Sequence, residues 1–328
     1  MIRPAMAAPY ARPTRDDIEA AARRIHPTAM RTPIVRSDWL SDTVRASVWL
    51  KLEIVQTTGA FKIRGATNAV LRLRDTRPDV RRIVTASAGN HGQAIALAAA
   101  RAGLSARVHV PATAPTAKLD AIERWGAEIV KASSYDEAEA RALAEAGDAS
   151  VAHISAYNHP DVIAGAGTVA LEMFDDVPDL DTLIVPLGGG GLLSGAAIVA
   201  RALGRAVTVI GAETEASPVF TTSLAAGRIT TVTIRPTLAD GLAGNMEPGS
   251  QTFGFVQELV DRVALVSESA LGHAMRELVA RERFIVEGAG AVGVAALLQG
   301  GLDVAGRRVG VVLSGRNVDS RVIARVLA

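Results

Sequence analysis

A lysine stands among packing residues in the stretch TTGAFKIRGA, which runs from Thr57 to Ala66. Lys62 follows Phe61 at the predicted start of a helix, where its amine is partly removed from water. Burial disfavours the charged form of a lysine and lowers its pKa, so the amine can act as a nucleophile and afterwards as a base. The pattern favours a Schiff-base lysine; an ordinary surface cation is the alternative.

A run of four glycines, Gly188, Gly189, Gly190 and Gly191, separates a β-branched strand from an apolar helix that starts near Leu192. Backbone N–H groups in such a run can turn inward around an anion, and the helix N-terminus adds its dipole. The run lacks the GxGxxG spacing of a dinucleotide site and the Lys-Ser/Thr of a Walker loop. We interpret it as a phosphate cradle; a tight turn that only needs flexibility is the alternative.

A second loop opens another predicted helix and consists of Ser87, Ala88, Gly89, Asn90 and His91, with the preceding strand predicted to end at Ser87. N–H groups at a helix start suit a second anion such as a carboxylate, and the Asn90 amide can hydrogen-bond to a ring substituent. Helix capping is the alternative role for Asn90. For His91 we favour a structural role over a catalytic one.

Ser314 lies where the strand RRVGVVL runs into a turn. Its hydroxyl could donate a hydrogen bond to a buried acceptor, or could serve as an ordinary turn or cap residue. Taken alone, this serine does not distinguish the two roles.

The elements that must position these residues are short β-rich runs alternating with Ala-rich segments of helical period, such as RRIVTAS before NHGQAIALAAARAG. This alternation predicts an α/β fold with parallel sheets and helices on both faces. Ligands in such folds bind at the carboxyl ends of strands, where the loops above lie. Four strand–helix units from about Arg81 to Ser155, then wider spacing and a long irregular section from Gly227 to Asp261, indicate two lobes with a cleft.

Composition narrows the class of protein. The chain has 328 residues, 49% of them hydrophobic, enough for a sizeable core. Its 35 Lys and Arg nearly balance 34 Asp and Glu, so we expect no nucleic-acid or membrane partner. The absence of cysteine excludes disulfides, thiolate metal sites and a cysteine nucleophile. No signal peptide and no apolar run of about 18 residues is found, and a cytoplasmic protein is expected.

In their order along the chain, these motifs resemble the fold-type II pyridoxal-phosphate enzymes, specifically the threonine/serine dehydratase and serine racemase group. TTGAFKIRGA is similar to the S-F-K-x-R-G-A lysine motif, SAGNHGQAIA to the asparagine loop and GGGGLLSG to the phosphate loop, while VEGAGAVG and LSGRNVD resemble E-x-A-G-A and S-G-G-N. The resemblance covers about Arg31 to Asp319. It implies two open, twisted, mainly parallel sheets flanked by helices, with the cofactor between a large domain of residues 1–56 and 156–328 and a smaller one of residues 57–155.

The resemblance also implies which residues hold pyridoxal 5'-phosphate. Lys62, beside Phe61, would form the Schiff base, Asn90 would meet the ring hydroxyl, and residues 188–192 would hold the phosphate. Ser314 would lie at the pyridine nitrogen. Because serine cannot protonate that nitrogen as an aspartate would, the ring stays neutral and withdraws electrons more weakly, which suits elimination from Cβ.

Residues 87–91 would bind the substrate carboxylate, and Glu287 would lie near the site. The implied reaction is removal of water from L-threonine or L-serine, giving a 2-oxo acid and ammonia, with Lys62 as the base. A homodimer or homotetramer is implied as well.

Four departures from the family pattern narrow this prediction. Ala88 replaces the serine that racemases use as their second acid/base, so efficient racemisation is not expected. Ala60 stands where serine is usual in the lysine motif. Glu213 matches a family cation ligand, but Val219 stands at the second ligand position, so the carboxylates are few for a divalent cation and none is expected. The chain is too short after Ser314 for a C-terminal regulatory domain.

Arg316 replaces the second glycine of S-G-G-N and suggests an alternative substrate. Its cation could pair with an extra anionic group, as in 3-hydroxyaspartate or a dehydratase substrate from hydroxyectoine breakdown; a solvent-directed arginine is the other interpretation. A β-replacement enzyme, a threonine synthase, a serine racemase and a non-catalytic phosphate-binding protein are further alternatives. The wall of the substrate pocket cannot be read from the sequence.

Overall fold

The structure is a computed structural model that describes residues 11–328. Its strands are β1 (Ile34–Ser37), β2 (Ser47–Leu52), β3 (Arg82–Ala86), β4 (Ser105–Pro111), β5 (Glu128–Ala132), β6 (Val151–His153), β7 (Thr182–Pro186), β8 (Thr208–Thr214), β9 (Arg262–Val266) and β10 (Arg308–Leu313). In the described part of the chain they form a six-stranded sheet of order β1-β2-β10-β7-β8-β9 and a four-stranded sheet of order β5-β4-β3-β6. Neighbouring strands are parallel except β1 and β2, which are antiparallel.

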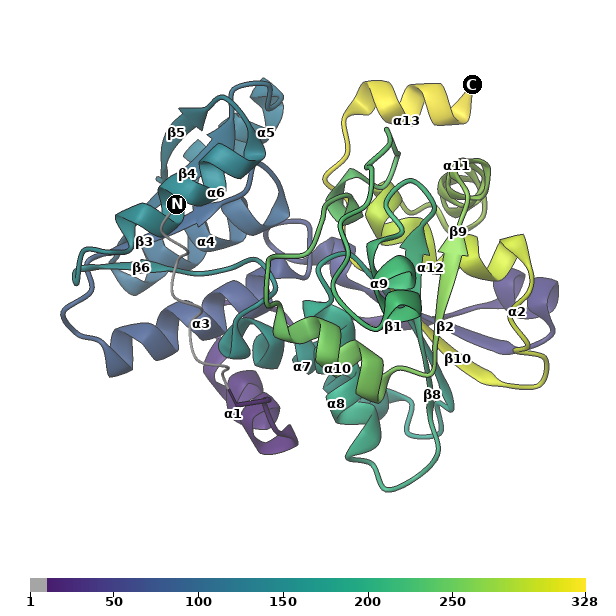
Figure 1. The fold of residues 1–328 in the computed structure, drawn as a ribbon. Helices are drawn as coiled ribbons and strands as arrows, with labels where there is room; N and C mark the ends of the chain where they lie inside the picture. The colour runs from purple at the N-terminus through teal and green to yellow at the C-terminus, as the bar shows by residue number, and fades with distance from the viewer. Residues whose placement is uncertain (1–10) are drawn as a thin grey trace.

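Helices flank both sheets, and the two sheets lie in separate lobes (Figure 1). The helices are α1 (Arg15–Ile25), α2 (Asp38–Val44), α3 (Lys62–Thr76), α4 (Asn90–Ala102), α5 (Thr116–Glu123), α6 (Tyr135–Glu145), α7 (Pro160–Asp176), α8 (Gly191–Arg201), α9 (Val219–Ala226), α10 (Gln251–Leu259), α11 (Glu268–Glu277), α12 (Gly288–Gln299) and α13 (Ser320–Leu327), with short turns η1 (Glu53–Val55), η2 (Asp240–Leu242) and η3 (Leu278–Glu282). The prediction of two mainly parallel sheets flanked by helices is confirmed. The strands of the smaller sheet lie between residues 82 and 153, which supports our proposal of a small domain over residues 57–155.

A stack of three helices joins the two lobes and fixes the start of α3. A Cβ on Gly165 of α7 would lie 2.7 Å from Cα of Gly65 on α3, and one on Gly195 of α8 would lie 2.8 Å from Cα of Gly167 on α7. Only glycine permits backbones to approach so closely. The helix that begins at Lys62 is therefore packed, through α7, against the helix that follows the four-glycine run.

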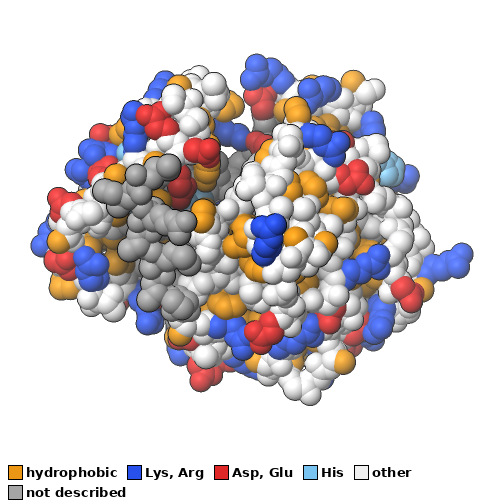
Figure 2. Space-filling model, viewed as in Figure 1, with side chains coloured by type: hydrophobic (Ala, Val, Ile, Leu, Met, Phe, Trp, Pro, Cys, Tyr) orange, Lys and Arg blue, Asp and Glu red, His pale blue; other side chains and the backbone are white. Residues whose placement is uncertain are grey.

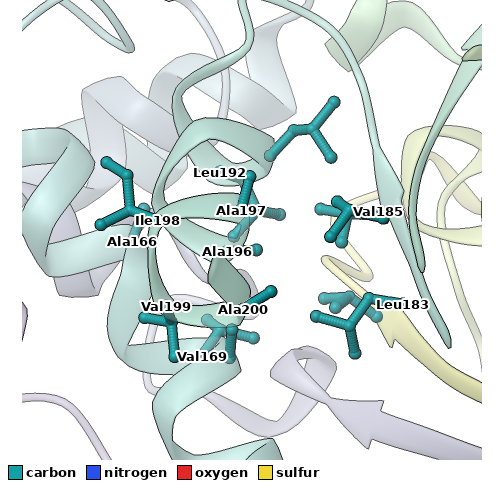
Figure 3. Close-up of a cluster of buried hydrophobic side chains, with 14 of the residues drawn as sticks. Ala166, Val169, Leu183, Val185, Leu192, Ala196, Ala197, Ile198, Val199 and Ala200 are labelled. Atoms are coloured by element: carbon teal, nitrogen blue, oxygen red, sulfur yellow. The ribbon is translucent and has the colours of Figure 1, made fainter. Parts of the chain in front are cut away.

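The core beneath this stack is aliphatic. Figure 3 shows side chains of α8 and β7 facing one another, among them Ala196 and Ala197 opposite Leu183 and Val185, all essentially inaccessible to water. Burying one Val or Leu side chain contributes about 1.5–3 kcal/mol. A strand and a helix packed in this way hold the loop between them, residues 187–190, in a defined position.

Two local predictions are wrong. The section from Gly227 to Asp261 is not irregular throughout, because it contains η2 and the nine-residue helix α10. The sequence of α10 includes Gly254, Thr252 and two phenylalanines, which are weak helix formers, so packing rather than propensity decides its conformation. Strand β3 ends at Ala86, one residue before the predicted end.

The surface agrees with the balanced composition. Basic and acidic side chains are interspersed over the face in Figure 2 rather than gathered by sign. Among residues 11–328, no helix is long and apolar enough to cross a bilayer.

Candidate active site

Lys62 is the first residue of α3, and the segment before it is tied to the end of β10. Ala60 forms an antiparallel bridge with Gly315, and the Phe61 N–H donates to the Ser314 carbonyl at 3.0 Å. Lys62 Nζ donates to the Ala156 carbonyl at 2.8 Å. Burial lowers the pKa of Lys62 from 10.5 to about 8, although the nearby Glu287 carboxylate opposes this. A useful fraction of the amine is therefore neutral near neutral pH.

The four-glycine run forms the turn between β7 and α8. Gly190 has φ +86°, which favours glycine, and a Cβ on Gly189 would lie 2.3 Å from the Tyr157 ring. Within residues 11–328, the N–H groups of Gly188, Gly189 and Gly190 donate no hydrogen bond. Unpaired N–H groups at a helix N-terminus form a site for an anion.

Asn90 and Glu287 are brought together from opposite lobes. Asn90 begins α4, Glu287 precedes α12, and Asn90 Nδ2 donates to Glu287 Oε1 at 2.7 Å. Burial raises the pKa of Glu287 to about 7, with the Asn90 hydrogen bond acting against it. The charge of Glu287 also acts on Lys62, so all three residues lie in one neighbourhood.

The rest of the asparagine loop is accessible, apart from its histidine. Ser87, Ala88 and Gly89 are half-buried, and Ser87 Oγ accepts from the Gly89 N–H at 3.2 Å. His91 is buried, with Nε2 3.2 Å from the Ile154 carbonyl oxygen, and burial lowers its pKa to about 3. A histidine held neutral in this way fits the structural role that the sequence favoured.

Ser314 and Arg316 have different surroundings. Ser314 is buried at the end of β10, next to the lysine segment. Arg316 is exposed, and its side chain pairs with no residue in the described part of the chain, while its N–H donates to the Gly59 carbonyl. The structure thus brings Ser314, but not the Arg316 side chain, into the group around Lys62.

Comparison with known proteins shows the family to which this chain belongs. Residues 25–315 match the family model described as "Pyridoxal-phosphate dependent enzyme". The chain belongs to this family. It is 40% identical to the L-threonine ammonia-lyase of Thermotoga maritima, over 96% of this chain and 78% of the relative. It is 38% identical to the L-threo-3-hydroxyaspartate ammonia-lyase of Saccharomyces cerevisiae, over 96% of this chain and 97% of the relative. The solved structure of maize serine racemase superposes with a TM-score of 0.90 at 34% identity, covering 96% and 97% of the two chains.

These findings confirm the predicted threonine/serine dehydratase group and its cofactor, pyridoxal phosphate. The residues present fit the cofactor. The unpaired N–H groups of residues 188–190 and the N-terminus of α8 suit its phosphate, with Leu192 in the first turn of that helix. Lys62 supplies a partly buried amine of lowered pKa for its aldehyde, beside the Phe61 ring.

The candidate cation ligand Glu213 is used for another purpose. Its Oε1 accepts from the Phe220 N–H at 2.7 Å, and its Oε2 from the N–H and hydroxyl of Thr221. The carboxylate therefore accepts hydrogen bonds from N–H groups in the first turn of α9 that have no partner within the helix. Among residues 11–328, no group of three or more His, Asp and Glu side chains could hold a metal ion.

Sequence reasoning missed several residues around the site. Asn317 Nδ2 donates to Asn90 Oδ1 at 2.7 Å, and Thr252 Oγ1 donates to the Gly189 carbonyl at 2.8 Å. The Tyr157 hydroxyl accepts from the Glu247 N–H at 2.7 Å, which places its ring over the glycine turn. Asn317 and Tyr157 both follow the carboxyl end of a strand, and that position was the available signal.

A buried ion network lies behind Lys62. Arg64 Nε donates to Glu53 Oε2 at 2.8 Å and Arg64 Nη1 to Glu172 Oε1 at 2.7 Å, while Lys51 Nζ donates to Glu172 Oε2 at 2.6 Å. These four residues, which we call the ion quartet, tie α3 to η1, β2 and α7. The quartet explains the arginine two residues after the lysine, whose role the motif did not reveal.

Proposed function

We propose that this chain is an ammonia-lyase that removes water from a β-hydroxy α-amino acid, with L-threonine and L-serine as its first substrates, and releases a 2-oxo acid and ammonia. The observation that carries the proposal is a partly buried amine, Lys62, whose pKa is lowered to about 8, in a site shared by the Asn90–Glu287 pair and close to the glycine turn. An amine that is partly neutral can be a nucleophile in one step and a base in another.

Bound pyridoxal phosphate supplies an aldehyde that captures the substrate amine and a ring that acidifies the substrate Cα–H. Lys62 Nζ takes the Cα proton, the Cβ–O bond breaks, and the hydroxyl leaves as water after gaining a proton. The released enamine then takes up one water to give the 2-oxo acid and ammonia. The unpaired N–H groups of residues 188–190 would hold the phosphate, and Ser314 would lie at the ring nitrogen without charging it. The asparagine loop, residues 87–91, would orient the substrate carboxylate. Ala88 offers no proton to the opposite face of Cα, which favours elimination over racemisation.

The test of this proposal is covalent trapping on Lys62. We expect borohydride treatment of the purified protein with pyridoxal phosphate to leave a reduced adduct on Lys62, found by peptide mass spectrometry. Lys62→Ala should lose the adduct and at least about 10³-fold of the 2-oxo acid release from L-threonine. Lys131→Ala, a change at an exposed lysine, is the matched control and should keep both. Absence of an adduct in the wild-type protein would reject the proposal.

A second candidate substrate is 3-hydroxyaspartate. It is supported by the identity with the yeast relative and by the exposed Arg316, whose side chain pairs with no described residue and whose backbone is bonded to the segment before Lys62. If Arg316 binds the second carboxylate, Arg316→Gly should lower kcat/KM for 3-hydroxyaspartate about tenfold or more relative to L-threonine. An unchanged ratio of the two values would remove Arg316 from the site.

The predicted dimer or tetramer and the cytoplasmic location are also part of the proposal. Light scattering of the purified holoenzyme measures the first, and we expect a mass of two or four chains.

A further inference from the structure

Asn317 links three segments of the site through one amide nitrogen. Its Nδ2 donates to the Thr58 carbonyl at 2.7 Å and to Asn90 Oδ1 at 2.7 Å. Thr58 belongs to the segment that leads into Lys62, and Asn90 begins α4. Asn317 itself follows β10 by four residues. One side chain thus ties the lysine segment, the asparagine loop and the strand that carries Ser314.

The backbone around Asn317 is shaped to admit these side chains. Gly59 has φ +71°, and a Cβ there would lie 2.6 Å from Asn317 Oδ1. A Cβ on Gly315 would lie 2.1 Å from Glu287 Oε1. No side chain larger than that of glycine fits at either position without displacing Asn317 or Glu287.

The hydrogen bonds run in one direction, from Asn317 through Asn90 to Glu287. An amide has an oxygen that only accepts and a nitrogen that only donates. Because the donor of Asn317 meets Asn90 Oδ1, the Asn90 Nδ2 group must face the opposite way, toward Glu287. Without Asn317, the bond to Glu287 alone would hold the Asn90 amide in this orientation.

We propose that Asn317 is a positioning residue that fixes the amide orientation of Asn90, and so keeps an N–H of Asn90 available to the ring hydroxyl oxygen of pyridoxal phosphate. This inference rests on the proposed function, because it needs the cofactor in this site. Asn90 Nδ2 carries two hydrogens, so it can donate to Glu287 and to the cofactor oxygen together.

Two variants at position 317 separate orientation from packing. Asn317→Asp keeps the shape but replaces the donor with an acceptor, so Asn90 should turn over and present its oxygen to the cofactor. Asn317→Ala removes the donor without imposing the reverse orientation. Asn245→Asp is the matched control, because Asn245 makes the same kind of bonds, to the backbone of Val232, on an exposed segment.

The measurements are the dissociation constant of pyridoxal phosphate, from equilibrium dialysis, and the pH midpoint of the visible absorption band of the holoenzyme. We expect Asn317→Asp to weaken cofactor binding about tenfold or more, Asn317→Ala to weaken it less, and the control to leave it within twofold. The pH midpoint of the band should move to higher pH in both variants, and further in Asn317→Asp than in Asn317→Ala. The reason is that a ring oxygen without a hydrogen-bond donor holds its shared proton more tightly. Thermal unfolding of each variant identifies any loss of fold.

Wild-type affinity and midpoint in both variants would overturn the positioning role, as would a larger effect of Ala than of Asp in folded protein. If the wild-type protein itself forms no band, the proposed function fails, and that outcome is distinct from failure at position 317.

Discussion

The ion quartet and the active site both bury ionisable groups, but they treat charge in opposite ways. In the quartet, each charged side chain of Lys51, Glu53, Arg64 and Glu172 contacts one of opposite charge. Burial alone would raise the pKa of Glu53, yet Arg64 holds it below its usual value. Burial likewise opposes the charge of Arg64, yet its two carboxylate neighbours raise its pKa.

In the active site, the hydrogen-bond partners of the ionisable groups are neutral. Lys62 Nζ donates to a carbonyl, and Glu287 accepts from an amide. Burial then dominates, bringing the pKa of Lys62 down to about 8 and that of Glu287 up to about 7. Lys51 lies between these cases, because burial lowers its pKa although Glu172 opposes it. A buried group in direct contact with an opposite charge thus keeps its own charge and stabilises the fold. A buried group without such a partner has a shifted pKa and can exchange protons near neutral pH.

The largest effect should come from breaking the quartet. Arg64→Met leaves two buried carboxylates without their main partner, and removal of one member of a buried ion pair costs about 3–5 kcal/mol. We expect urea unfolding to show a loss of this size. Arg72→Met on the same helix breaks an ion pair between an exposed arginine and Asp161, and should cost less than about 1 kcal/mol. Equal losses in the two variants would contradict the distinction between the quartet and the surface.

Opposite pH slopes are the next expected effect. The folded-state pKa of Glu287 is raised from 4.5 to about 7, so the folded state binds more protons and its stability falls as pH rises through that window. Glu287→Gln should remove this fall, which is on the order of 3 kcal/mol. The pKa of Glu53 is lowered, so its contribution is present above pH 4.5 and is lost as the pH falls through the folded-state value.

Stability curves of wild type, Glu287→Gln and Glu53→Gln between pH 3 and pH 8, without added cofactor, measure these slopes. We expect the two variants to differ from wild type with opposite dependence on pH. The same sign for both would mean that the two carboxyl groups have similar surroundings.

Much of the fold and part of the site could be predicted from local patterns. Strand–helix junctions with small or polar residues marked Lys62, Asn90 and residues 188–191, because the chemistry at each junction depends on neighbours in the chain. The Asn317–Asn90 bond joins residues 227 positions apart, and no local pattern describes it. The quartet is hidden for the same reason, since its members are ordinary charged residues until the fold buries them.

The smallest effect concerns a surface ion pair that connects the lobes beside the site. Lys118 of α5 donates to Asp240 of η2, and η2 packs against Gly188 at the glycine turn and Ala289 at the start of α12. Both charges act on Glu287: Asp240 raises its pKa and Lys118 lowers it. The side chains of this pair are 30% and 57% exposed, so solvent and salt screen their effect.

The fall in protein stability that Glu287 causes has a midpoint in pH. Lys118→Met should move this midpoint to higher pH and Asp240→Asn should move it to lower pH, each by less than about one pH unit. Both shifts should shrink in about 1 M salt, where the Debye length is only about 3 Å. If both variants moved the midpoint in the same direction, the pair would be acting by holding the lobes together, because a purely electrostatic effect must change sign with the charge removed. Opposite shifts would mean instead that an ion pair at the surface tunes the protonation of the buried Glu287 carboxyl. The quartet would not respond in this way, because its charges are fully paired.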